Sequence, residues 1–189
     1  PIYEPGLEEL IKRHLATKRL CFEDRLSQAV SEADVVLLTY DTPVDDDDHP
    51  NLLVLDQTIE ELASVIKPQT LLVINSQIPL GTAERWQEEI EKKRRGARID
   101  LVYSPENLRL GQAIELFKNP DMIVIGSGSD TGKEKAGAFY SAFKSEKYYV
   151  SWRTAEMAKH ALNAFFATSI SFANEIGLLC DKLGADGIE

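Results

Sequence analysis

Short apolar segments alternate with longer amphipathic segments along most of the chain. The apolar runs predict strands at residues 33–40, 70–77, 100–103, 122–128 and 148–152, and a shorter run predicts one more at 19–24. Apolar residues at helical spacing predict helices over residues 25–32, 52–66, 83–95, 109–117 and 133–143. The strand segments lack period-two alternation, so we expect strands buried on both faces, residues 33–40 in particular. This order predicts an α/β protein with a mostly parallel sheet.

The last segment predicts a much longer helix. Thr154 is an expected N-cap, helical apolar spacing continues from Ala155 to Leu183, and Gly184 is expected to end the helix. Such a helix is too long for one more crossover between strands. We expect it to leave the first domain and to form the spine of a second domain or of a dimer.

The first residues, PIYEPGLEELIKRH, predict a turn that leads directly into an amphipathic helix. Pro1 and Pro5 restrict φ, and Gly6 permits a tight turn. This pattern is typical of a connection between two elements, so we expect a further element upstream of it.

Charge and cysteine content narrow the class of protein. The formal net charge of −10 over 189 residues disfavours nucleic acid and anionic membranes as partners. The basic run at 92–95 follows EEIE, which predicts a solvated, salt-bridged helix face. Cys21 and Cys180 are far apart and give neither a disulfide framework nor a zinc spacing. With no signal peptide and no spanning apolar run, the sequence predicts a cytoplasmic protein outside the membrane.

In parallel sheets ligands bind at the carboxyl ends of the strands, which directs attention to three loops, YDTPVDDDDHP, NSQIPLGT and YSPENLRLG. Glu106 in the third loop is either a general base or only an acid at a helix N-terminus. The acidic run at 45–48 favours a solvated loop over a cation site, so no metal is expected.

Lys159 and Asn163 lie four residues apart in the predicted long helix and therefore share a face, with Glu156 one turn earlier. Two such donors can stabilise a developing oxyanion or bind a sugar hydroxyl. The alternative is an ordinary polar stripe on an otherwise apolar helix.

Taken as an ordered set, five stretches resemble one family. They are PIYEPGLEEL, the strand followed by DTP at 35–43, INSQIPLGT, SPENLRLGQAI with NPDMIVIG, and TAEMAKHALNAFFA with SFANEIGLLC. In order and spacing they resemble the UDP-glucose/GDP-mannose dehydrogenase family, which comprises NAD-dependent nucleotide-sugar 6-dehydrogenases. The resemblance covers essentially the whole chain.

The resemblance implies a partial Rossmann-type, doubly wound and mostly parallel sheet followed by a long central helix. Residues 1–152 would form an incomplete NAD-binding domain, and residues 153–189 the central helix and the start of the dimerisation and substrate region. Members oxidise the C6 alcohol of a nucleotide sugar to a carboxylate with two NAD, through a cysteine-bound thiohemiacetal. The implied partners are a UDP-sugar and a second copy of the chain.

The resemblance also assigns residues to roles. It implies Glu106, Lys159 and Asn163 as catalytic residues, the last two steadying the oxygen at C6. It implies that the sugar substrate contacts Glu106, Asn107, Leu108, Arg109, Lys159 and Asn163. It implies that NAD contacts Tyr40, Asp41, Thr42, Pro43, Ser76, Gln77 and Leu110.

Two parts of the family pattern do not occur in these residues. Family members carry a GxGxxG unit upstream of the PIYEPGLEEL stretch and a catalytic cysteine in a glycine-rich motif beyond the central helix. Neither Cys21 nor Cys180 lies in such a motif. We therefore expect a chain that is the middle of an enzyme, and that by itself neither turns over substrate nor binds NAD tightly.

Three residues depart from the family pattern within the matched region. Asn107 stands where an aromatic residue is usual, Leu110 where a second glutamate is usual, and Gln77 where a threonine is usual. These changes indicate either a divergent sugar specificity or a non-catalytic homologue that serves in assembly. GDP-mannose remains an alternative substrate.

Overall fold

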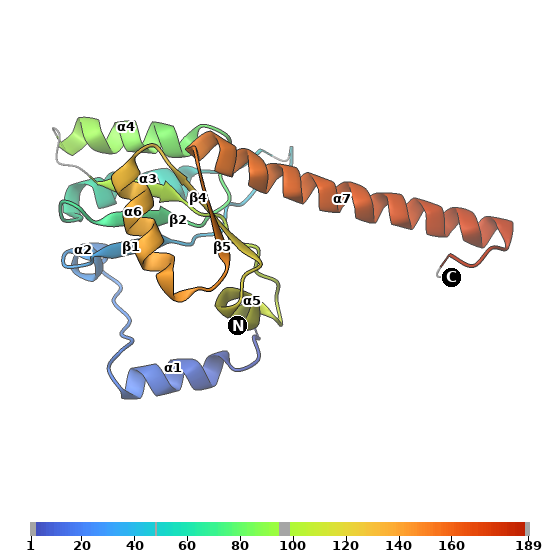
Figure 1. The fold of residues 1–189 in the computed structure, drawn as a ribbon, viewed down its shortest axis with the longest axis horizontal. Coiled ribbons are helices and arrows are strands. Elements are labelled where there is room, and N and C mark those ends of the chain that lie inside the picture. Colours follow the sequence, from blue (N-terminus) through green and yellow to red (C-terminus); the bar gives the residue numbers. More distant parts are fainter. Residues whose placement is uncertain (1–2, 48, 95–98, 188–189) are drawn as a thin grey trace. The chain divides into compact units, whose positions relative to one another are not determined.

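The computed structural model describes residues 3–47, 49–94 and 99–187. The chain divides into two units, Pro1–Glu156 and Met157–Glu189. The first unit contains a five-stranded sheet with the order β1-β2-β3-β4-β5 (Figure 1). Its strands are β1 (Val35–Leu38), β2 (Leu71–Ile74), β3 (Asp100–Tyr103), β4 (Met122–Ser127) and β5 (Glu146–Val150). All neighbouring strands are parallel except β3 and β4, which are antiparallel. The expected mostly parallel α/β sheet is confirmed.

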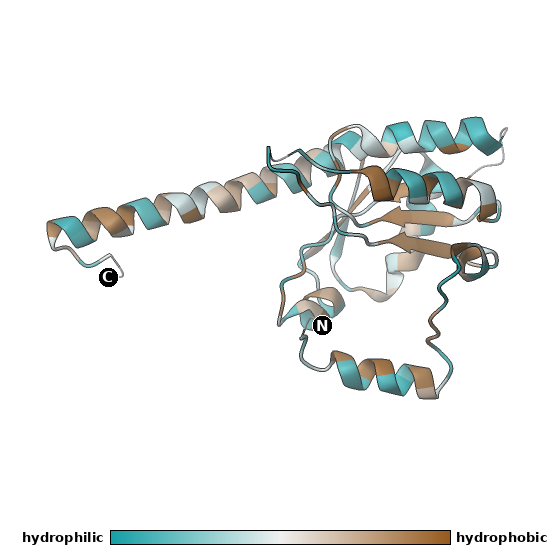
Figure 2. Ribbon diagram, turned by 180° about the vertical axis from the view of Figure 1, so that it is seen from behind, coloured by the Kyte–Doolittle hydropathy of each residue, from teal (hydrophilic) through white to brown (hydrophobic). Residues whose placement is uncertain are grey.

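Helices cover both faces of this sheet. On one face, α3 (Leu53–Val65) and α4 (Thr82–Arg94) bury Leu62 and Trp86 against the side chains of β1, β2 and β3. On the other face, α6 (Asp130–Phe139) and the 3₁₀ turn η1 (Tyr140–Ala142) pack Ala136 and Tyr140 on a second apolar cluster. Strands β1 and β2 are accordingly apolar along their whole length (Figure 2). Because successive strand residues point to opposite faces, each of the central strands contributes to both clusters.

The remaining helices are α1 (Leu7–Ala16), α2 (Leu26–Val30), α5 (Ala113–Lys118) and α7 (Trp152–Leu183). No residue of α1 is buried. None of the helices in the described part of the chain is both long and apolar enough to cross a membrane.

The first turn of α7 lies very close to β4. A Cβ atom added to Gly126 would lie 2.6 Å from the Cβ of Ala155, and one added to Gly128 would lie 2.4 Å from the Trp152 ring. The Trp152 indole N–H also donates a hydrogen bond to the Leu101 carbonyl at 3.1 Å. The start of this helix is therefore fixed within the first unit.

The ends of α7 differ in part from the expectation. The N-cap is Ser151, whose hydroxyl oxygen accepts a hydrogen bond from the Thr154 N–H at 3.2 Å, and Thr154 lies inside the helix. At the other end Gly184 has a φ of 71°, and the Ala185 N–H donates to the Cys180 carbonyl at 3.0 Å. The predicted stop at Gly184 is confirmed.

Several expected elements form at different places. Residues 19–24 are not a strand, because a strand requires a neighbour in a ladder and the described residues give this segment none. Strand β1 is not buried on both faces: it pairs with β2 alone among the described residues, and Leu37 is 43% exposed. Helix α5 begins four residues later than expected.

The basic run is largely the salt-bridged surface that the sequence predicts. Lys92 and Lys93 pair with Glu88 and Glu60, both at 3.3 Å. Arg94 differs, since its guanidinium donates to the carbonyl of Ile66 at 2.6 Å near the end of α3. Pro1, Asp48 and Arg95, which belong to three of the motifs noted in the sequence, lie outside the described residues.

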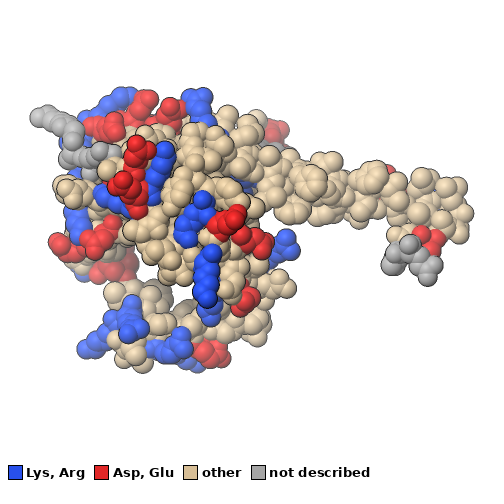
Figure 3. Space-filling model, in the orientation of Figure 1, with Lys and Arg blue, Asp and Glu red and all other residues tan. Residues whose placement is uncertain are grey.

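In the second unit, the part of α7 from Met157 onward exposes a series of large apolar side chains. The view in Figure 3 shows few charged residues along it. The exposed side chains are Met157, Phe165, Phe166, Ile170, Phe172, Ile176, Leu178, Leu179 and Leu183. A helix with this surface is typical of one that is covered by a further apolar partner.

Candidate functional site

The carboxyl ends of β1, β2 and β3 are joined by hydrogen bonds that start in one residue. The Asn75 backbone N–H donates to the Leu38 carbonyl at 2.9 Å, and the Asn75 side-chain amide donates to the Ser104 carbonyl at 2.5 Å. Asn75 therefore ties the end of β2 to both neighbouring strands. The three loops that the sequence singled out leave the sheet from this one edge.

Two of the loops are also bonded to each other. The Thr42 hydroxyl donates to the Gln77 carbonyl at 2.6 Å, while the Asp41 carboxylate accepts the Thr42 N–H at 2.9 Å. The structure thus brings together Thr42 and Gln77, which lie 35 residues apart in the sequence. Tyr40 is 47% exposed beside them, and Ser76 is buried with its hydroxyl directed to the Leu38 carbonyl at 3.4 Å.

Glu106 lies in the third loop, seven residues before α5 begins at Ala113. It therefore does not belong to a helix N-terminus, and that alternative for its presence is wrong. Its side chain is exposed and accepts the backbone N–H of Leu108. The next residues of the loop are also exposed, namely Asn107, Leu108, Arg109 and Leu110. This stretch presents a carboxylate, an amide and a guanidinium to solvent within four positions.

Glu4 fixes the far end of this loop. Its two carboxylate oxygens accept the N–H of Gly111 at 2.7 Å and the N–H of Ile114 at 3.3 Å. Gly111 has a φ of 84°, a conformation that a glycine adopts without strain. The PIYEPG stretch is therefore bound to the loop that carries Glu106, a contact across 107 residues that the sequence did not reveal.

Lys159 and Asn163 lie on α7 in the second unit and are half-buried. They are four residues apart on one continuous helix, as expected, and so occupy the same face. Glu156, one turn earlier, belongs to the first unit and is completely buried. The sequence placed Glu156 one turn before Lys159 but did not reveal that its carboxylate accepts the N–H groups of Gly81 and Ala83.

Tyr103, at the end of β3, has a hydroxyl pKa that is changed by burial and by a nearby acid. Burial raises the pKa of its hydroxyl well above the usual value, and the negative charge of Glu156 raises it further. Tyr103 is therefore a neutral phenol at physiological pH and is not a proton acceptor.

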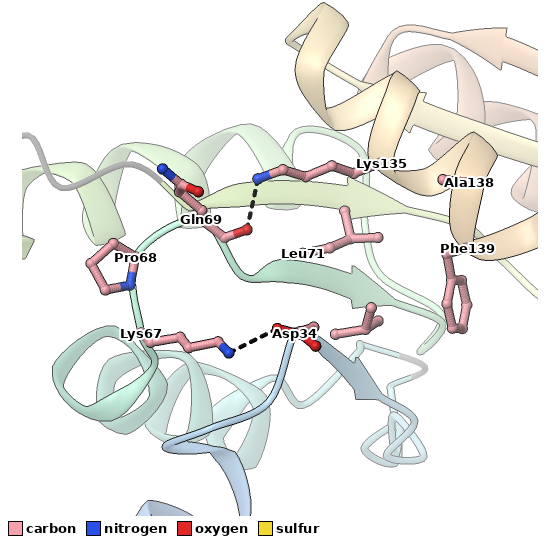
Figure 4. A pocket seen from close by; sticks show the side chains of 9 residues that line it. Asp34, Lys67, Pro68, Gln69, Leu71, Lys135, Ala138 and Phe139 are labelled. Carbon is pink, nitrogen blue, oxygen red and sulfur yellow. Dashed lines mark hydrogen bonds and ion pairs between the residues drawn. The ribbon is translucent and has the colours of Figure 1, made fainter.

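A cavity of about 560 Å³ lies away from this edge, at the amino-terminal ends of β1 and β2 beneath α6 (Figure 4). Ion pairs border it: Lys67 contacts Asp34 at 2.8 Å, and Lys135 contacts Asp100 at 2.7 Å. Ligands of parallel sheets bind at the opposite edge, so we do not place the active site here. Among the described residues no cluster of His, Cys, Asp and Glu has a geometry that would hold a metal ion.

Family models match almost the whole chain. Residues 1–144 match the NAD-binding domain of the UDP-glucose/GDP-mannose dehydrogenase family, and residues 153–189 match its central domain. The chain belongs to this family. NAD is the cofactor of the domain to which residues 1–144 belong.

Individual relatives agree with this assignment. The chain is 37% identical over 187 residues to the UDP-glucose 6-dehydrogenase YwqF of Bacillus subtilis, covering 98% of this chain and 42% of the relative. It is 39% identical over 192 residues to a UDP-glucose 6-dehydrogenase of Rhizobium meliloti, covering 98% of this chain and 44% of the relative.

Solved structures of the family superimpose closely. A UDP-glucose dehydrogenase from Pyrobaculum islandicum has a TM-score of 0.92 and 35% identity, covering 98% of this chain and 44% of that one. A GDP-mannose dehydrogenase from Pseudomonas aeruginosa has a TM-score of 0.93 and 28% identity, with 99% and 44% covered. The chain thus spans less than half the length of these dehydrogenases.

The residues at the carboxyl edge fit part of a dinucleotide. The bond between Thr42 and Gln77 holds two loops side by side at the ends of adjacent parallel strands, where this class of sheet binds its nucleotide. Tyr40 and Gln77 are both exposed at this edge.

Proposed function

We propose that this chain contributes the cofactor loops and part of the catalytic groups of a nucleotide-sugar 6-dehydrogenase. The observation that carries the proposal is the hydrogen-bonded edge at which residues 40–43, 76–77 and 104–110 leave β1, β2 and β3. Three groups of residues thus lie in loops at the carboxyl edge of one sheet: those proposed to contact the cofactor, those proposed to contact the sugar, and Glu106, proposed to transfer a proton. The match to the family's NAD-binding and central domains supports the same assignment.

The proposed reaction converts a C6 hydroxymethyl group to a carboxylate. Each of two oxidation steps would remove a hydride from C6 and a proton from its oxygen, and one water would supply the second carboxylate oxygen. NAD, when bound, supplies the hydride acceptor for both steps. The balance is one alcohol, one water and two NAD to one carboxylate, two NADH and three protons.

The residues have distinct parts in this proposal. Glu106, exposed in the third loop, accepts a proton or orients the water. Lys159 and Asn163 donate hydrogen bonds to the oxygen on C6, where negative charge develops. Asn107, Leu108 and Arg109 contact the sugar. The residues proposed to contact NAD are Tyr40, Asp41, Thr42, Pro43, Ser76, Gln77 and Leu110.

We propose a UDP-sugar as the substrate, because three curated relatives with 35%, 37% and 39% identity are UDP-glucose 6-dehydrogenases, whereas the GDP-mannose dehydrogenase structure is 28% identical. The exposed apolar side chains of α7 support assembly with a second copy through this helix. Measurement of the mass of the protein in solution tests this dimer.

The experiment is an assay of NADH formation with a panel of UDP-sugars and GDP-mannose. Where the reading frame continues beyond these 189 residues, the longer product is assayed beside the chain alone, for which we expect no turnover. In the active form Lys159→Ala should lower kcat by about 10²–10³-fold, as expected for loss of one oxyanion donor. Lys182→Ala, near the end of the same helix, is the control and should retain kcat.

The outcomes separate the alternatives. Turnover of GDP-mannose in place of UDP-sugars would reassign the substrate. Absence of turnover with every sugar in every form would support a non-catalytic homologue that serves in assembly.

A further inference from the structure

Glu156 is a completely buried acid that no proposed catalytic role uses. Its two carboxylate oxygens accept backbone N–H groups, from Gly81 at 2.6 Å and from Ala83 at 2.9 Å. Donors and acceptor are 75 and 73 residues apart in the sequence. Burying a carboxylate costs free energy unless its oxygens accept hydrogen bonds. The N–H groups of Gly81 and Ala83 provide these hydrogen bonds to Glu156.

The two N–H groups belong to the start of α4, which begins at Thr82. The first N–H groups of a helix have no acceptor within the helix, and the helix dipole favours a negative group there. Glu156 therefore caps α4 with a side chain from another helix. Nearby, Arg153 binds Glu84 at 2.7 Å, an exposed ion pair between the same two helices.

The loop that runs from the end of β2 to the first residue of α4, residues 75–82, is consequently held at both ends. Its start is bound to β1 and β3 through Asn75. Its middle is bound to Thr42 through the Gln77 carbonyl, and buried Ile78 packs in the core. At its end Gly81 has a φ of 87°, a conformation that favours glycine. Because glycine has no side chain, its own backbone does not restrict the loop to this conformation. Glu156 supplies the restraint at that end.

We propose that Glu156 is a positioning residue for the 75–82 loop. By fixing Gly81 and Ala83 it fixes the path of the loop back to Gln77 and, through the Thr42 hydrogen bond, the relation between the two loops at the carboxyl edge. In this role it acts through the loop and not by contact with cofactor or sugar. The inference that it thereby sets the affinity for NAD rests on the proposed function of Ser76 and Gln77.

Amide hydrogen exchange on the unmodified protein is the first test. The Gly81 amide precedes α4 and the Ala83 amide lies in its first turn, where the helix itself offers no acceptor. Both should nevertheless be protected like the core amides of β2, because their acceptor is buried. Exchange at the rate of an open loop would overturn the contact itself. This measurement needs no variant and so does not depend on the folding of one.

The second test compares Glu156→Gln with Glu84→Gln. Gln keeps the size of Glu156 but presents an NH₂ group to one of the two donors. We expect faster exchange at Gly81 and Ala83 by about tenfold or more, the equivalent of one lost hydrogen bond, and also at Gln77 and Thr42. Glu84→Gln, which removes only the exposed ion pair between the same helices, should leave these amides unchanged. If only the Gly81 and Ala83 amides exchange faster, and those of Gln77 and Thr42 do not, Glu156 is only a helix cap and the proposal is wrong.

The functional arm measures KM for NAD and for the nucleotide sugar in the active form of the protein. Displacement of a cofactor loop should raise KM for NAD about tenfold in Glu156→Gln and leave KM for the sugar unchanged. A merely structural defect would lower the amount of active protein without this split, and would overturn the positioning role. If the unmodified protein neither binds NAD nor turns over, the proposed function fails, and the exchange comparison alone decides whether Glu156 fixes the loop.

Discussion

Glu156 and Glu4 perform the same task in two different environments. Each accepts two backbone N–H groups at the start of a helix, Glu156 at α4 and Glu4 at α5, and each thereby holds a loop that carries candidate site residues. Glu156 is completely buried, whereas Glu4 is half-buried in the turn that precedes α1. Water can replace the carboxylate in the second case but not in the first.

Hydrogen-bond geometry alone therefore does not determine how much a contact contributes to stability. At Glu156, loss of the acceptor would leave two N–H groups without a partner, that of Ala83 at a buried position and that of Gly81 at a partly buried one. At Glu4, the same loss exposes two N–H groups to solvent. We therefore expect the first clamp to stabilise the fold and the second to order a loop.

The largest effect should follow from breaking the buried clamp. Glu156→Gln should lower the free energy of unfolding by about 3 kcal/mol, because it replaces one charge-assisted hydrogen bond by a clash of donors in a buried site. Urea unfolding measures this, with Glu84→Gln as the control that should match the unmodified protein. An unfolding free energy equal to that of the control would show that the burial of Glu156 has little energetic consequence.

An intermediate loss of stability should follow from replacing a third carboxylate, Asp100. It is buried like Glu156, but it accepts hydrogen bonds from side chains. Burial raises its pKa, but hydrogen bonds from Lys135, Thr131 and Ser129 outweigh this and leave the pKa below the ordinary value of 3.8. Asp100 therefore stabilises the fold above that value, and the contribution is lost as pH falls through the lowered pKa. Asp100→Asn should cost about 1–2 kcal/mol at neutral pH.

The pH dependence provides the check on Asp100. Urea unfolding from neutral pH down to acid should show a shallower loss of stability in Asp100→Asn than in the unmodified protein. Lys67 also lowers the pKa of Asp34, but this ion pair is exposed to solvent, so Asp34→Asn is the comparison and should flatten the slope less than Asp100→Asn does. Identical slopes in all three proteins would contradict the role of Asp100.

The smallest effect on stability should come from the half-buried clamp. Glu4→Gln should lower the free energy of unfolding by about 1 kcal/mol or less. Its local effect should be clearer, since the Gly111 and Ile114 amides would exchange faster, while those of Gly81 and Ala83 remain protected. Glu8→Gln, at an exposed pair with Lys12 on α1, is the control and should change none of these amides. A destabilisation as large as that of Glu156→Gln would remove the distinction between the two clamps.

The sequence was most informative where a structure depends on neighbouring residues. Residues 100–103 were predicted as a strand and form β3 with the same bounds, because a short apolar run between breakers has few alternatives. The stop of α7 at Gly184 also has a local cause in its positive φ. The order of strands and helices, and with it the fold class, follows from this kind of signal.

Features that depend on distant residues were missed. Residues 19–24 carry strand-forming side chains, but a strand exists only with a neighbour to pair with. The contacts of Glu4 with Gly111 and of Glu156 with Gly81 connect residues 107 and 75 positions apart, and no local pattern encodes them. For Glu156 a partial signal was present, since an acid on an otherwise apolar helix requires a partner.

The close approach of α7 to β4 limits how these positions can change during evolution. Gly126 leaves no room for a Cβ atom beside Ala155, and Gly128 leaves none beneath the Trp152 ring. An alanine at 126 would require a glycine at 155, and a side chain at 128 would require a smaller residue at 152. Across homologous sequences these positions should therefore vary as linked pairs, and a chimera that takes the strand from one homologue and the helix from another should fold only when both members of each pair come together.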